Sequence, residues 1–160
     1  MEKTAVFPGS FDPFTLGHKV VVEQALGVFD RVVIAVGVNS GKQGLFTPEN
    51  RVRLIRDIFA GDSRIEVKAY YGLTADFCKE EGINFILRGL RNSVDFEYER
   101  NIAQINHELY PKLQTVVLFT PAKYVAISSS AIREMVTFGG DPSGFMPAGI
   151  NLKNYLREEI

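Results

Sequence analysis

The chain has 160 residues with a formal net charge of −1, and 46% of them are hydrophobic. This composition suits one domain with a substantial core. The near-neutral charge argues against nonspecific nucleic-acid binding, which needs a basic excess. The single cysteine, Cys78, excludes an intramolecular disulfide, and no apolar run has the length of a signal peptide or a membrane span. We therefore expect a cytoplasmic protein that binds neither nucleic acid nor membrane.

Short runs of apolar and β-branched residues alternate along the chain with segments of helical periodicity. The short runs are mostly continuous rather than alternating, as in strands that are buried on both faces of a parallel sheet. In chain order we expect a strand at 3–7, a helix at 17–28, a strand at 31–37, a helix at 48–59, a strand at 64–70, a helix at 74–82, a strand at 84–89, a helix at 93–111, a strand at 115–120, a helix at 128–140 and a last helix in the tail 151–160.

This order of elements predicts the fold class. Strands that alternate with helices indicate an α/β protein, here a Rossmann-like, doubly wound five-stranded parallel sheet with helices on both faces. Several helix starts are well marked: Thr47 is a suitable N-cap, Pro48 fits the first helical position, and serines precede the helix at 128–140. We see no linker or internal repeat, so we expect residues 1–160 to form a single domain.

The loops that follow the predicted strands are the most informative part of the sequence. In a doubly wound sheet, ligands bind beyond the carboxyl ends of the strands. These loops are rich in glycine, serine, lysine and arginine, and Asp12 is an exceptional carboxylate among them. Lys42, Arg88 and Arg91 supply positive charge, and arginine can grip phosphate oxygens with two hydrogen bonds. Together with helix N-termini near His18 and at 128–130, they predict an anion site.

Each feature also has a simpler interpretation when it is taken alone. "PGSFDP" can be an ordinary turn, the arginines can be surface ion-pair partners, and a serine run can be only a helix cap. His18 alone can be a cap or a packed residue. We assign no role to His107, and we interpret Cys78 as a small buried hydrophobic residue. The anion site is favoured because the loops all fall on the same predicted edge of the sheet.

Three separated motifs resemble a known family. "GSFDPFTLGH" resembles the N-terminal signature of the nucleotidyltransferase superfamily, whose hallmark is a T/H-x-G-H turn that opens the first helix. "RGLRNSVDFEYE" (88–99) and "ISSSAIRE" (127–134) are similar to motifs of the bacterial phosphopantetheine adenylyltransferases, including the spacing between them. The resemblance extends through nearly the whole chain.

The resemblance implies a reaction in coenzyme A biosynthesis. ATP and 4′-phosphopantetheine would give 3′-dephospho-coenzyme A and pyrophosphate. The resemblance also implies dependence on Mg²⁺, a cytoplasmic homohexamer built as a dimer of trimers, and coenzyme A as a candidate feedback ligand.

The resemblance further assigns roles to individual residues. His18 would contact the α-phosphate and stabilise the transition state, and Lys42 and Arg91 would complete the catalytic set. The residues implied to bind phosphopantetheine are Ser10, Lys42, Thr74 and Arg88, with Leu73 beside the pantetheine arm. The residues implied to bind ATP are Ser10, Phe11, His18, Gly89, Leu90, Arg91, Glu99, Tyr124, Val125, Ala126, Ile127, Ser128, Ser129 and Ser130. Arg133 is a weaker candidate for the β- and γ-phosphates, because an outward ion pair fits it equally well.

The implied chemistry fits these residue types. The nucleophile would be a phosphate oxygen that is already ionised at neutral pH, so no general base is needed. Preorganised donors and cations would instead hold two polyanions together. We expect His18 to donate a hydrogen bond rather than to shuttle a proton; the helix dipole disfavours its charged form and the phosphates favour it, so its charge stays open. Mg²⁺ would be held mainly by phosphates and water, so we name no metal-binding residue.

Three alternatives remain at this point. The first is a related nucleotidyltransferase that acts on another phosphorylated small molecule, such as nicotinate mononucleotide or a polyol phosphate. The second is a non-catalytic nucleotide-binding sensor on the same scaffold. The third is an RNA-binding fragment related to class I aminoacyl-tRNA synthetases, which the acidic isoelectric point disfavours.

Overall fold

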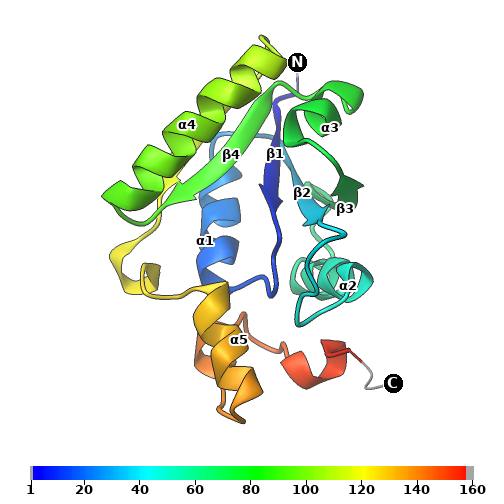
Figure 1. Cartoon of the computed structure of the whole chain (residues 1–160), viewed down its shortest axis with the longest axis vertical. Coiled ribbons are helices and arrows are strands. Elements are labelled where there is room, and N and C mark those ends of the chain that lie inside the picture. Colours follow the sequence, from blue (N-terminus) through cyan, green and yellow to red (C-terminus); the bar gives the residue numbers. More distant parts are fainter. Residues whose placement is uncertain (1, 158–160) are drawn as a thin grey trace.

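The five strands of the computed structural model are parallel and lie in the order β3-β2-β1-β4-β5 (Figure 1). The structure describes residues 2–157. The strands are β1 (Thr4–Gly9), β2 (Arg31–Val38), β3 (Ile65–Tyr71), β4 (Phe85–Leu90) and β5 (Gln114–Phe119). The helices are α1 (Leu16–Ala25), α2 (Pro48–Ile58), α3 (Thr74–Glu80), α4 (Ser93–Leu109) and α5 (Ser129–Thr137), and short 3₁₀ turns are η1 (Ala122–Tyr124), η2 (Ser143–Phe145) and η3 (Leu152–Tyr155).

Both faces of the sheet are covered by helices, as the sequence predicts. Along β1, Ala5 and Phe7 belong to a core cluster with residues of α1 and α2, whereas Val6 between them belongs to a second cluster with α3. The side chains of a strand alternate between the two faces, so a continuous apolar run fills both cores. The predicted Rossmann-like doubly wound α/β fold is therefore confirmed.

The order of the strands reverses beside β1. The chain moves outward from β1 through β2 to β3, and then returns to the other side of β1 with β4 and β5. Val6 of β1 is in register with Ile86 of β4, so the carboxyl ends of these two strands open toward the same crevice. Ligands bind at such a switch point in doubly wound sheets.

The first loop differs from its predicted form at both ends. β1 continues through Pro8 to Gly9, and α1 begins at Leu16 rather than at residue 17, after the N-cap Thr15. A Cβ placed on Gly9 would lie 2.8 Å from the Cζ atom of Phe11. The Phe11 ring therefore fills the space beside Gly9. Phe11 itself has a left-handed φ of 49°, a conformation that costs free energy for a bulky residue.

The predicted last helix over 151–160 is wrong in the part of the chain that the structure describes. Residues Leu152–Tyr155 form a single 3₁₀ turn, and residues 158–160 lie outside the described residues. Side chains of α2 bind the carbonyls here: Asn50 donates to Tyr155 O at 3.0 Å and Arg53 donates to Asn154 O at 2.6 Å. These carbonyls satisfy their hydrogen bonds on α2 instead of in a further helical turn.

Over residues 2–157, none of the helices combines the length and apolar character needed to cross a bilayer.

Candidate active site

Two cavities open at the carboxyl edge of the sheet and share one wall. The first has a volume of about 350 Å³ and extends over β2, α3 and α4. The second has a volume of about 340 Å³ and extends over the N-termini of α1 and α5. Both are lined by Pro8, Gly9, Ser10, Arg88 and Glu99. Two separate molecules bound in these cavities would therefore meet at the ends of β1 and β4.

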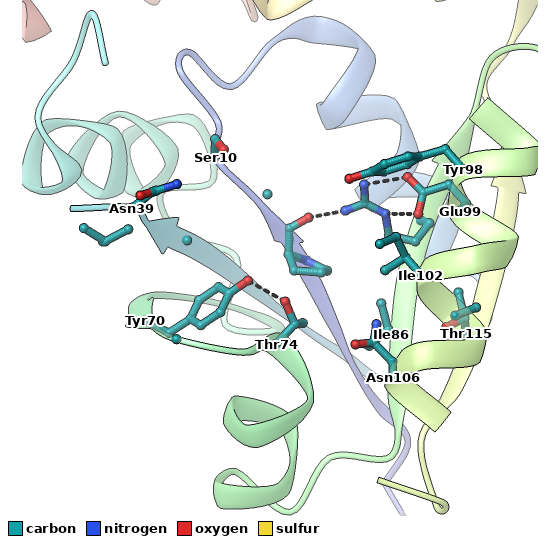
Figure 2. A pocket seen from close by; sticks show the side chains of 17 residues that line it. Ser10, Asn39, Tyr70, Thr74, Ile86, Tyr98, Glu99, Ile102, Asn106 and Thr115 are labelled. Atoms are coloured by element: carbon teal, nitrogen blue, oxygen red, sulfur yellow. Dashed lines mark hydrogen bonds and ion pairs between the residues drawn. The ribbon is translucent and has the colours of Figure 1, made fainter. Parts of the chain in front are cut away.

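Arg88 is held rigidly in the shared wall. Its Nε and Nη2 atoms donate to the Glu99 carboxylate at 2.8 and 2.6 Å, and its Nη1 atom donates to Pro8 O at 2.6 Å (Figure 2). Glu99 is buried on α4, where an unpaired carboxylate would be costly. Glu99 is predicted to bind ATP; it lines both cavities, but its carboxylate is engaged by Arg88. The pair fixes the orientation of the guanidinium before any substrate arrives.

The second cavity gathers most of the residues that are predicted to bind ATP. The α5 N-terminus contributes Ser128 to Ser130, and the Ser128 hydroxyl also caps the helix by accepting from Ala131 N. Predicted residues that line this cavity are Ser10, Phe11, His18, Arg88, Gly89, Arg91, Glu99, Tyr124, Ile127, Ser128, Ser129 and Ser130. The cavity therefore combines two helix N-termini with three arginines, Arg88, Arg91 and Arg133, which suits a polyphosphate.

His18 is fixed by the start of its own helix. The backbone N–H of Thr15 donates to Nδ1 of His18 at 2.9 Å, and the Thr15 hydroxyl accepts from the backbone N–H of His18 in return. Because Nδ1 is an acceptor, the proton of the neutral ring sits on Nε2. Burial, followed by the charges of Arg88 and Arg91, lowers the pKa of His18 from 6.5 to about 3. His18 is therefore a neutral hydrogen-bond donor through Nε2.

The first cavity is lined by a mixture of apolar, hydroxyl and amide side chains. Figure 2 shows Tyr70 and Thr74 on one side and Tyr98, Ile102 and Asn106 of α4 on the other. The hydroxyls of Tyr70 and Thr74 lie 2.8 Å apart and share a hydrogen bond. This lining suits an elongated ligand that carries amides and short aliphatic segments. Thr74 is a predicted substrate-binding residue, and the structure places it here.

Five of the predicted residues do not line either cavity. Lys42 is exposed on the loop after β2. Another residue of the same loop, Asn39, does line the first cavity. The other four residues outside the two linings are Leu73, Leu90, Val125 and Ala126. Leu90 is only 5% exposed, because its side chain belongs to the core, and only its backbone is close to the site.

Arg91 is present in the second cavity and is paired with Asp95. Its Nε atom donates to Asp95 at 3.1 Å, and its backbone N–H donates to the same carboxylate at 3.0 Å. Asp95 lies one turn before Glu99 on the same face of α4. The two carboxylates therefore pair with the two arginines, Asp95 with Arg91 and Glu99 with Arg88. The Arg91 pair is more exposed than the Arg88 pair. Arg91 is therefore the easier of the two arginines to redirect toward a phosphate.

Sequence reasoning left the direction of Arg133 open and assigned no role to the face of α4 that lines the first cavity. Arg133 reaches inward: its Nη1 atom donates to Asp12 O at 2.9 Å and its Nη2 atom to the Ser130 hydroxyl at 3.1 Å. The spacing of Arg133 in the sequence does not decide whether its side chain points into the site or toward solvent. Tyr98 lies within the motif at 88–99 but has no role assigned from it, and Ile102 and Asn106 lie beyond that motif. The three share one face of the predicted helix at intervals of four, which is the signal that points to a common surface.

Comparison with known proteins shows the family to which the chain belongs. A family model described as "Cytidylyltransferase-like" matches residues 6–135. The phosphopantetheine adenylyltransferase of Cytophaga hutchinsonii is 47% identical over 92% of this chain and 98% of its own length. That of Flavobacterium psychrophilum is 44% identical over 94% of this chain and 99% of its own length. The chain belongs to the phosphopantetheine adenylyltransferase family.

A solved structure shows the same fold at low identity. A bifunctional NMN adenylyltransferase/ADP ribose pyrophosphatase from Francisella tularensis has a TM-score of 0.71 and 16% sequence identity. The match covers 95% of this chain but only 47% of that protein. At this identity the likeness concerns the fold alone.

The neutral state of His18 gives a testable pH dependence. As the pH falls below 6.5, the unfolded chain binds a proton at this position that the native state does not bind until about pH 3. The native state therefore loses stability on acidification through this window. Between pH 6.5 and 5, urea unfolding should show a loss of roughly 1–2 kcal/mol that is absent in His18→Gln. Nitrogen NMR of the native ring should show a neutral Nε2–H tautomer throughout; an imidazolium at pH 5.5 would contradict the assignment.

Proposed function

We propose that this chain transfers the adenylyl group of ATP to 4′-phosphopantetheine, which gives 3′-dephospho-coenzyme A and pyrophosphate. The observation that supports this best is the shared wall, because Arg88 lies between a cavity suited to a polyphosphate and a cavity suited to an amide-bearing arm. The relatives at 47% and 44% identity bear the name of this activity. We further propose that the chain acts as one nucleotidyltransferase domain in the cytoplasm.

The reaction is a direct displacement at the α-phosphorus. A phosphate oxygen of phosphopantetheine attacks, a new P–O bond forms, and the bond to the bridging oxygen of pyrophosphate breaks. The attacking oxygen is already ionised, so the site needs no base, and its task is to position two anions. Arg88 holds the incoming phosphate at the shared wall, while Arg91 and the α5 N-terminus hold the ATP phosphates. We assign Lys42 to the incoming phosphate as well, through its loop after β2.

His18 stabilises the charge that develops on the α-phosphate. Its Nε2–H is a fixed donor because Thr15 holds Nδ1. A preorganised donor of this kind costs no reorganisation at the moment of reaction. The neutral ring keeps its Nε2–H throughout the reaction, so the same hydrogen bond serves the forward and the reverse direction.

Mg²⁺ fits this site through the substrate rather than through the protein. Over residues 2–157, no three side chains of His, Cys, Asp or Glu come together as a metal site. Three carboxylate residues line the second cavity: Asp95 and Glu99 are bound to arginines, and Asp12 accepts from the backbone of Leu45 and Phe46. Mg²⁺ keeps several waters and binds phosphate oxygens readily. When bound, it would neutralise charge on the leaving pyrophosphate, with phosphates and water as its ligands.

We propose a homohexamer, with coenzyme A as a feedback ligand in the same cavities as the substrates. Large apolar side chains on α4 and β5 remain exposed, including Val94 at 75%, Ile105 at 55% and Phe119 at 80%. A surface of this kind on a protein of ordinary composition suits contacts between subunits.

Light scattering should give the mass of six chains, and a monomeric mass at micromolar concentration would contradict the assembly.

Pyrophosphate release is the direct test of the proposed reaction. The chain should release pyrophosphate when ATP, Mg²⁺ and 4′-phosphopantetheine are all present, and mass spectrometry should detect dephospho-coenzyme A. CTP in place of ATP is the control for nucleotide choice, and nicotinate mononucleotide is the control for the acceptor. ATP binding without pyrophosphate release would instead support a nucleotide sensor.

His18→Ala tests the transition-state role. Loss of one preorganised donor should lower kcat by about 10²–10³-fold, while the affinity for ATP, measured by calorimetry, should change little. The reason is that the hydrogen bond strengthens as charge develops on the α-phosphate. Near-normal turnover in this variant would exclude the role, and a loss confined to ATP affinity would make His18 a binding residue only.

A further inference from the structure

A buried ion pair joins the loop after β1 to the loop after β2. The Asp12 carboxylate accepts from Leu45 N at 2.9 Å and from Phe46 N at 2.8 Å. Arg51 of α2 donates from Nε to Phe46 O at 3.1 Å and from Nη1 to Ser10 O at 2.9 Å. The two side chains are only 8% and 7% exposed, and Nε of Arg51 lies 3.9 Å from Oδ1 of Asp12. Neither side chain is assigned a part in the reaction described above.

The bond from Arg51 fixes a peptide group at the edge of the second cavity. A trans peptide holds its C=O and N–H in opposite directions. Because Arg51 pulls Ser10 O toward α2, the N–H of Phe11 is turned away from α2. Phe11 also has its left-handed φ of 49°, which persists only where neighbouring contacts over-determine it. Arg51 therefore supplies part of the restraint that keeps this strained peptide in place.

The Asp12 carboxylate restrains the other loop. Its two acceptor bonds fix the backbone at Leu45 and Phe46, three residues beyond Lys42. The contact is tight: a Cβ on Gly44 would lie 2.7 Å from Oδ2 of Asp12. Asp12 O also accepts from Arg133 of α5, so the carbonyls of Ser10 and Asp12 are bound by arginines of two different helices.

We infer that Asp12 and Arg51 are positioning residues that hold the Ser10–Phe11 peptide and the Lys42 loop in one fixed arrangement for phosphate transfer. This inference rests on the proposed function. Asp12 lies in the wall of the second cavity, and Arg51 lines neither cavity. The pair acts by setting where the phosphate-binding groups of two loops lie relative to each other. An enzyme with a loosened pair binds both substrates, but it seldom aligns them.

Arg51→Lys tests the inference, because lysine keeps the charge but cannot bind Phe46 O and Ser10 O with a planar fork. In pyrophosphate release, kcat per folded enzyme should fall at least tenfold, while KM for each substrate changes less than threefold. Gly44→Ala should shift kcat in the same direction, because its new Cβ displaces the Asp12 carboxylate. The loss from Arg51→Lys should also shrink in a Lys42→Ala background, since part of it acts through that loop.

Two matched controls separate positioning from folding. Arg56→Lys changes another arginine of α2, which donates from Nη2 to Val67 O of β3 at 3.0 Å and not to either loop. Gly144→Ala adds a Cβ that meets no atom within 4 Å. Both should keep kcat, and urea midpoints should match between Arg51→Lys and Arg56→Lys. If Arg51→Lys does not fold, Gly44→Ala and its control alone decide the outcome.

Three results would overturn the inference: kcat within twofold of the parent in Arg51→Lys, an equal loss in Arg56→Lys, or full additivity with Lys42→Ala. Amide hydrogen exchange measures the restraint imposed by the Asp12–Arg51 pair independently of enzyme activity. The amides of Leu45 and Phe46 should exchange at least tenfold faster in Arg51→Lys, and unchanged exchange would also count against the pair. If the parent chain releases no pyrophosphate, the proposed function fails while the exchange result still decides the restraint.

Discussion

The site depends on the fixed guanidinium of Arg88. Two anionic substrates repel each other, and the carboxyl ends of β1 and β4 must bring them within reach of one another. Arg88 stands at this junction with three of its donors satisfied by Glu99 and Pro8. The buried Glu99 carboxylate offsets the desolvation cost of the Arg88 guanidinium and fixes the plane of that group. The conformational entropy of the Arg88 side chain is therefore lost on folding rather than on substrate binding.

The remaining groups of the site differ in how firmly they are held. His18 is fixed by backbone groups of its own helix, and burial keeps its pKa low, so its single Nε2–H has one direction. Arg91 is paired on the surface with Asp95, where solvent weakens the attraction. The protein therefore combines rigid donors near the site of bond exchange with a more mobile cation toward the polyphosphate.

The sheet could be predicted from the sequence because its strands are continuous apolar runs and its helices have clear caps. The place of the two cavities could be predicted in outline because charged residues follow strand ends. His18 and the serines of α5 line one cavity, as the motifs suggest, and their roles stay predictions. The Asp12–Arg51 pair could not be predicted. Asp12 stood out as a lone carboxylate, but Arg51 looked like any polar position of an amphipathic helix, and only the packing of α2 against two loops brings them together. The helix predicted for the tail is wrong because side chains of α2 bind the tail's carbonyls. This is a tertiary contact, which the local periodicity of the sequence does not show.

The contact between Gly9 and Phe11 has a consequence for how this chain can vary. With the Phe11 ring 2.8 Å from where a Cβ at position 9 would stand, neither position is free to change by itself. A side chain at position 9 requires a smaller residue at position 11, and a smaller residue there removes the aromatic packing against Phe7, Phe14 and His18. Gly9 therefore leaves the space that the Phe11 ring fills in the aromatic cluster, and the packing of that ring against the His18 imidazole depends on the absence of a Cβ at position 9.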